Sequence, residues 1–173
     1  LRTHLRRELQ DLLGHNLRLV ALGRLAALPA AAQRELDAVI AATSGNTGMR
    51  LNLAINYSGR AELADAMNSL VEEARGQGTL QQLRIDEEAI ASKLYTAGLP
   101  DPDLLIRTSG EMRVSNFLLW QIAYAELYVT EKLWPDFDRE DLLRALLEYQ
   151  KRDRRYGGVM PAARAVAVPG AAA

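Results

Sequence analysis

The residues best suited to do chemistry lie in one stretch, 107–126, which reads RTSGEMRVSNFLLWQIAYAE. Around a glycine turn it carries two arginines, a serine and two glutamates: Arg107, Arg113, Ser115, Glu111 and Glu126. A guanidinium group is a planar fork of N–H donors that matches phosphate oxygens, and a serine hydroxyl with the N–H groups of a turn can complete an anion cradle. A carboxylate beside bound phosphates is a typical ligand of Mg²⁺. The stretch therefore predicts a diphosphate site with Mg²⁺ close by.

The same residues also have an ordinary structural interpretation. Arg107 and Arg113 could form an ion pair with Glu111 or another carboxylate, because surface arginines are common. Glu126 on its own could be a solvated surface charge. An arginine that leaves the apolar run DLLI and enters a glycine turn is less ordinary, so spacing alone leaves both interpretations open.

The stretch closely resembles the C-terminal signature of the cis-prenyltransferases, the undecaprenyl diphosphate synthase family. That family's pattern is an apolar strand, then Arg-Thr-x-Gly-Glu-x-Arg-x-Ser-Asn-Phe-Leu-Leu-Trp-Gln, then Tyr-x-Glu. Here the pattern runs from Ile106 to Gln121 and ends with Tyr124 and Glu126. A match of this length at fixed spacing is very unlikely to arise by chance.

The resemblance implies a role for each residue of the signature. It assigns the diphosphate of isopentenyl diphosphate to four residues: Arg107, Arg113, Val114 and Ser115. Glu126 matches the family's Mg²⁺ ligand, and Glu111 is expected to orient the two arginines rather than to touch substrate. The implied reaction adds isopentenyl diphosphate to an allylic diphosphate primer such as farnesyl diphosphate, with cis double bonds, for synthesis of a polyprenyl lipid carrier.

Two shorter motifs extend the resemblance. Arg155 and Gly157 match an Arg-x-Gly motif that, in the family, reaches the active site of the partner subunit and contacts phosphate, so a homodimer is expected. The basic end of a helix closed by glycine is the ordinary interpretation of that segment. Residues 56–60, Asn-Tyr-Ser-Gly-Arg, resemble the family's Asn-Tyr-Gly-Gly-Arg with serine in place of the first glycine, and are expected to be mainly structural.

The family's other half-site is missing from this sequence. The Asp-Gly-Asn-x-Arg-Trp stretch, which binds the diphosphate of the allylic primer and supplies the catalytic aspartate, does not occur, and the first tryptophan is Trp120. We therefore expect no catalytic residue here and an N-terminally incomplete enzyme that is inactive alone. The alternative is a non-autonomous accessory subunit that completes the active site of another chain. The retention of the whole isopentenyl diphosphate signature favours the incomplete enzyme.

The elements that must position these residues alternate between helix and strand. Apolar spacing, caps and turn residues predict helices at 2–14, 29–42, 61–75, 86–95 and from 138 onward, with a short helix after the signature. Strands are predicted at 17–22, 51–55, 104–107 and 127–130. This order is typical of an α/β fold with a mainly parallel central sheet flanked by helices. Residues 1–158 are expected to form one domain and 159–173, rich in alanine, a disordered tail.

The bulk composition limits the possible partners. The chain has 173 residues, a formal net charge of −1 and no cysteine. That charge balance argues against nucleic acid, and the absence of cysteine excludes disulfides and thiol catalysis. No apolar run approaches the roughly 20 residues of a membrane span. We expect a cytoplasmic enzyme with at most peripheral membrane contact through its lipid product, and dimer packing along 117–134.

Overall fold

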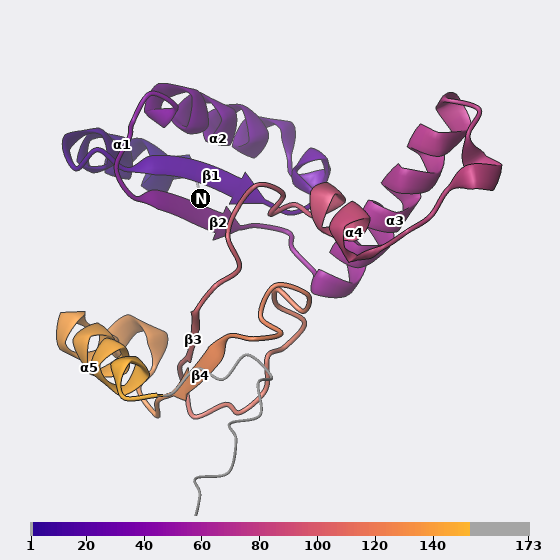
Figure 1. The fold of residues 1–173 in the computed structure, drawn as a ribbon. Coiled ribbons are helices and arrows are strands. Elements are labelled where there is room, and N and C mark those ends of the chain that lie inside the picture. Colours follow the sequence, from indigo (N-terminus) through magenta and orange to yellow (C-terminus); the bar gives the residue numbers. More distant parts are fainter. Residues whose placement is uncertain (1, 153–173) are drawn as a thin grey trace, which may run out of the picture. The chain divides into compact units, whose positions relative to one another are not determined.

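The computed structural model describes residues 2–152 (Figure 1). Within that range the helices are α1 (Arg2–Gly14), α2 (Ala30–Thr43), α3 (Gly59–Gly76), α4 (Glu87–Lys93) and α5 (Arg139–Gln150). The strands are β1 (Arg18–Leu22), β2 (Arg50–Ala54), β3 (Leu104–Arg107) and β4 (Glu126–Val129). Short 3₁₀ turns lie at Leu25–Ala27, Leu80–Gln82 and Trp134–Asp136. None of the described helices is long and apolar enough to cross a membrane.

The chain divides into two compact units, and the signature crosses from one to the other. The first unit holds residues 2–103 together with Met112–Ala125, and the second holds Leu104–Glu111 together with residues 126–152. Each unit contains one sheet of two strands in the described residues. The single domain over residues 1–158 therefore stays a prediction.

Both sheets are parallel, as the alternation of strands and helices predicted. In the first unit β1 pairs with β2 in the register Leu19↔Leu51, and α2 makes the crossover between them. In the second unit β3 pairs with β4 in the register Ile106↔Tyr128. The α/β class with parallel strands and flanking helices is confirmed, and the described strands pair as β1–β2 and β3–β4.

The core of the first unit lies on one side of the β1–β2 sheet. Helix α1 packs against α2, and α2 packs on β1 (Figure 1). The buried residues of this core are Leu12, Leu19, Leu36 and Val39. Partly buried residues at alternate positions of β2, including Leu51 and Leu53, pack against it. Because successive strand residues point to opposite faces, Arg50, Asn52 and Ala54 are left on the other side of the sheet.

Caps place most helix starts where the sequence predicts them. Pro29 precedes α2, and the side chain of Asp86 accepts a hydrogen bond from the N–H of Ala89 at 2.8 Å at the start of α4. Asp138 caps α5, and Asp141 bonds back to the Asp138 N–H to complete a capping box.

Two sequence predictions about helices are wrong. No helix follows the signature, because residues 122–124 form only turns before β4 begins at Glu126. On α5 the apolar spacing predicts Leu142, Leu143, Leu146 and Tyr149 on the inward face, but the three leucines are exposed and Tyr149 is only half-buried, whereas Ala145 and Asp141 are buried. Asp141 lies inward because Lys132 Nζ pairs with its carboxylate at 2.6 Å.

Candidate functional site

The turn after β3 fixes the backbone around Arg107. The Arg107 carbonyl accepts a hydrogen bond from the N–H of Thr130 at 2.9 Å, and the N–H of Gly110 donates to the Thr130 carbonyl at 2.9 Å. The N–H of Ser109 donates to the carbonyl of Lys132 at 2.8 Å. These two turn amides therefore bind the backbone of the segment after β4 and hold the turn against it.

Arg107 forms an ion pair with Glu111 four residues on. Both side chains are about two-thirds buried, with 31% and 34% of their surface exposed, so a carboxylate holds an arginine side chain that keeps part of its surface open. The turn brings a further carboxylate close. Gly110 has φ +64°, and a side chain there would overlap the carboxylate of Glu131. Glycine is therefore required at this position for two reasons, its backbone conformation and the closeness of Glu131.

Glu126 begins β4 and pairs with a cation. Its Oε2 accepts a hydrogen bond from Arg152 Nη1 at 2.7 Å, with 27% of the glutamate side chain exposed. The register of the sheet places Glu126 opposite Leu104, at the other end of β3 from Arg107.

The second part of the signature lies in the first unit, in the loop Met112–Ala125. There Arg113 and Ser115 are exposed, and the N–H of Phe117 donates to the carbonyl of Val114 at 3.1 Å. The positive φ values of Ser115 and Asn116 turn the loop sharply at this point. The ring of Phe117 packs edge-on against Tyr57, with the ring centroids 5.7 Å apart.

A buried carboxylate anchors the end of this loop. Glu62 of α3 is 1% exposed and accepts hydrogen bonds from the N–H of Tyr95 at 2.8 Å and from Gln121 Nε2 at 3.1 Å. The Tyr57 hydroxyl also donates to it. Burial, and then the hydrogen bond to Glu62, raise the pKa of Tyr57 well above its usual value. The network supplies hydrogen bonds to a carboxyl group that would otherwise be costly to bury.

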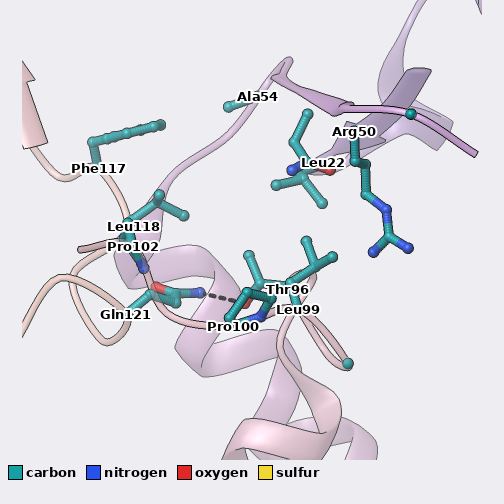
Figure 2. Close-up of a pocket in the computed structure, with 13 residues that line it drawn as sticks. Leu22, Arg50, Ala54, Thr96, Leu99, Pro100, Pro102, Phe117, Leu118 and Gln121 are labelled. Carbon is teal, nitrogen blue, oxygen red and sulfur yellow. Dashed lines mark hydrogen bonds between the residues drawn. The ribbon is translucent and has the colours of Figure 1, made fainter. Parts of the chain in front are cut away.

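A cavity of about 570 Å³ lies on the open face of the β1–β2 sheet (Figure 2). Leu22 of β1 and Arg50 of β2 line one side of it, and Thr96, Leu99 and Pro100 line it from the segment after α4. Gln121 connects two parts of the cavity wall, because its Nε2 donates a hydrogen bond to Thr96 Oγ1 at 2.8 Å. Most of the lining is apolar, with the following further members: Gly48, Asn52, Ala54, Gly98, Pro102, Phe117 and Leu118.

Comparison with known proteins decides the family. Residues 1–157 match the model of the Prenyltransf family, described as "Putative undecaprenyl diphosphate synthase". The chain belongs to this family. It is 49% identical over 156 residues to an isoprenyl transferase of Heliobacterium mobile, covering 90% of this chain and 60% of that protein. An isoprenyl transferase of Prochlorococcus marinus is 50% identical over 157 residues, covering 91% of this chain and 59% of that protein.

Two solved structures of similar proteins support both the membership of this chain in the undecaprenyl diphosphate synthase family and its fold. A lavandulyl diphosphate synthase from Lavandula x intermedia, crystallised with dimethylallyl diphosphate, is 36% identical with a TM-score of 0.85, covering 90% of this chain and 67% of that one. A probable undecaprenyl diphosphate synthase from Campylobacter jejuni is 31% identical with a TM-score of 0.75, covering 90% of this chain and 70% of that one. The chain spans about three fifths of the length of the curated relatives named above.

The signature residues of this undecaprenyl diphosphate synthase family member are divided between the two units. Arg107, Glu111 and Glu126 lie in the second unit, and the structure brings the first two together. Arg113, Val114 and Ser115 lie in the first unit. Arg155 and Gly157 lie outside the described residues. The substrate and metal roles of all eight stay predictions.

The described residues do not form a complete Mg²⁺ site by themselves. Among the described residues no group of three or more acidic or histidine side chains could hold a metal ion. Mg²⁺ is typically bound by one or two carboxylates together with substrate phosphates, so Glu126 alone is a suitable partner for a metal that arrives with a diphosphate. The ion pair with Arg152 would have to loosen for the metal to use both carboxylate oxygens.

The carboxylate of Asp65, in the first unit, is expected to make the stability of the fold depend on pH. Asp65 of α3 accepts a fork of hydrogen bonds from Arg24, at 2.7 and 2.8 Å, and a further one from the Tyr95 hydroxyl. The Arg24 bonds, and then Tyr95, lower the pKa of Asp65 to about 2.

Because the pKa of Asp65 is lower in the folded than in the unfolded protein, ionised Asp65 stabilises the fold above its unfolded pKa of about 4. This contribution is lost as the pH falls toward the folded pKa of about 2. Because the Asp65 side chain is 34% exposed, we expect no more than about 1 kcal/mol. Urea unfolding at pH 5 and pH 2.5 should show the loss in the wild type and a smaller loss in Asp65→Asn. An equal loss in both proteins would show that Asp65 is not responsible.

Sequence reasoning missed the residues that support the site rather than form it. Glu62 looks like an ordinary charge on an amphipathic helix, and Glu131 follows β4 with no motif around it. The one signal in the sequence that points to this region is the likeness of residues 56–60 to a family motif, which by itself indicates a mainly structural role.

Proposed function

We propose that this chain binds isopentenyl diphosphate together with Mg²⁺ and takes part in cis-prenyl transfer to an allylic diphosphate such as farnesyl diphosphate, for polyprenyl lipid-carrier synthesis. The observation that carries the proposal is Arg107, whose side chain is about two-thirds buried at the end of β3 and paired with Glu111 within the intact family signature. A related protein of known structure was crystallised with dimethylallyl diphosphate, which is also an isoprenoid diphosphate.

In the proposed reaction the chain's residues bind and orient the nucleophilic substrate. Arg107 and Arg113 donate hydrogen bonds from their guanidinium groups to the diphosphate oxygens, and the Ser115 hydroxyl adds a further donor. Glu111 keeps Arg107 in place, and Glu126 would hold the Mg²⁺. The metal, when bound, neutralises diphosphate charge.

The reaction itself forms one carbon–carbon bond. The isopentenyl double bond attacks C1 of the allylic primer, the primer's carbon–oxygen bond breaks, and its diphosphate leaves with the bonding electron pair. A proton is then lost from the isopentenyl unit, which leaves a cis double bond. Fixing the isopentenyl diphosphate beside the primer makes the encounter effectively intramolecular, which can contribute several kcal/mol to the lowering of the barrier.

We further propose that these 173 residues do not turn over on their own, because the sequence lacks the family's Asp-Gly-Asn-x-Arg-Trp stretch. The second candidate is an accessory subunit that lends its residues to a partner chain's active site. The complete isopentenyl diphosphate signature favours the enzyme, since a purely supporting subunit has no need of it. A homodimer, in which Arg155 and Gly157 reach the partner's site, and a cytoplasmic location with peripheral membrane contact belong to the same proposal.

An elongation assay tests the proposal. The 173-residue chain is incubated with labelled isopentenyl diphosphate, farnesyl diphosphate and Mg²⁺, beside an intact isoprenyl transferase such as that of Heliobacterium mobile. We expect no labelled polyprenyl product from the chain alone. Elongation at a rate comparable to that of the intact relative would contradict the half-site assignment.

A further inference from the structure

Ser58 is the position at which this chain departs from the family's Asn-Tyr-Gly-Gly-Arg motif, and its hydroxyl reaches the signature loop. The Ser58 Oγ accepts a hydrogen bond from Asn116 Nδ2 at 2.8 Å and another from the N–H of Ala61 at 3.2 Å. A hydroxyl oxygen has two lone pairs, so both acceptor sites are used. Glycine at this position could make neither bond.

Three successive residues hold Asn116. Besides the Ser58 contact, the N–H of Gly59 donates to the Asn116 carbonyl at 2.8 Å, and the N–H of Arg60 donates to Asn116 Oδ1 at 2.9 Å. The approach is close, because a Cβ on Gly59 would lie 2.9 Å from Cγ of Leu119. The backbone at the start of α3 therefore lies in direct contact with the loop Met112–Ala125, and Asn116 makes the hydrogen bonds between them.

The conformation that these contacts hold is one the loop would not favour alone. Ser115 and Asn116 both have left-handed backbones, with φ values of 48° and 62°. Such conformations are unfavourable for residues with a side chain, asparagine less so than serine, and they persist where surrounding contacts fix them. Asn116 directly follows Ser115 and lies three residues after Arg113, so the contacts at 116 act on the substrate-binding part of the loop.

We propose that Ser58 is a positioning residue for the diphosphate: through Asn116 it holds Ser115 and Arg113 in the conformation that binds isopentenyl diphosphate. The inference rests on the proposed function. Ser58 itself does not contact the substrate. When the loop loses this contact it spends less time in the competent conformation, and the apparent affinity falls by the same fraction.

The competing explanation is that Ser58 merely caps α3. A lost cap lowers stability but leaves the affinity of a folded protein unchanged. Asp86, which caps α4 through Ala89 and does not contact the loop residues named above, is the matched control.

Calorimetric titration of isopentenyl diphosphate with Mg²⁺ separates the two explanations. We expect Ser58→Ala to weaken binding about 3- to 10-fold, in line with the loss of one hydrogen bond, Ser58→Thr to restore it, and Asp86→Ala to leave it unchanged. Asn116→Gly removes the side chain but tolerates the left-handed backbone, so the double variant Ser58→Ala/Asn116→Gly should bind no more weakly than Asn116→Gly alone. Losses that multiply would show that Ser58 does not act through Asn116 and would overturn the inference.

Hydrogen exchange without ligand provides a readout that does not depend on binding. The amides of Gly59, Arg60 and Phe117 should exchange several-fold faster in Ser58→Ala and not in Asp86→Ala. If the wild type binds isopentenyl diphosphate and Ser58→Ala binds equally well, the inference fails and the proposed function stands. If the wild type does not bind it at all, the proposed function fails and the inference fails with it, whatever the exchange rates show.

Discussion

Glu62→Ala is expected to lower the free energy of unfolding by about 2–4 kcal/mol, because it removes the acceptor of a buried network. Three donors lose their partner: the Tyr57 hydroxyl, the Tyr95 N–H and Gln121 Nε2. Gln121 keeps its bond to Thr96, but Tyr57 and Tyr95 are left with partly buried donors that have lost this acceptor. The loss should appear in urea unfolding at neutral pH.

Two further variants make the Glu62 result specific. Glu62→Gln keeps the size of the side chain but presents an NH₂ group to a set of donors, so most of the loss should remain. Glu73→Ala, on the same helix, removes a solvent-accessible ion pair with Lys93 and a long hydrogen bond from Gln77, and should change the unfolding free energy by less than about 0.5 kcal/mol. Equal effects of the Glu62 and Glu73 replacements would show that the buried network does not stabilise the unit.

Arg107→Ala is expected to weaken the affinity for isopentenyl diphosphate about 100-fold. A bidentate, charge-assisted contact between guanidinium and phosphate contributes roughly twice as much as a neutral hydrogen bond, and alanine removes the charge and both donors. Arg107→Lys keeps the charge but lacks the planar fork, so we expect an intermediate loss of about 10-fold. Calorimetric titration with Mg²⁺ measures both.

The matched control for Arg107 is Arg84→Ala. Arg84 is exposed, lies outside the signature, and donates to the carbonyl of Leu83, so its removal should leave the affinity unchanged. Circular dichroism should show that each variant is folded before its affinity is compared. An Arg107→Ala protein that is folded and binds within about twofold of the wild type would remove Arg107 from the substrate site.

Elements governed by local chemistry could be predicted from the sequence. Asp86 and Asp138 cap the helices that they were expected to cap, and β3 occupies residues 104–107 as predicted. For the two caps the deciding interaction is made within a few residues along the chain, such as the bond from the Ala89 N–H to Asp86.

Features that depend on distant contacts could not be predicted. The left-handed backbone of Ser115 and Asn116 is such a feature, because residues 58–60, more than fifty residues earlier, hold Asn116 by hydrogen bonds. The burial of Glu62 likewise depends on Gln121, which lies fifty-nine residues later. The spacing of residue types along the chain does not indicate either contact.

The measurement that tests the central claim most directly is the titration of isopentenyl diphosphate into the 173-residue chain, with and without Mg²⁺. The account predicts saturable binding that strengthens when Mg²⁺ is present and loses that Mg²⁺ dependence in Glu126→Gln, because the amide is a poorer metal ligand than the carboxylate. Farnesyl diphosphate serves as the comparison, and we expect it to bind more weakly, since the family's allylic motif does not occur in this sequence. Absence of any binding of isopentenyl diphosphate, or binding that Mg²⁺ and Glu126→Gln leave unchanged, would contradict the assignment of this half-site.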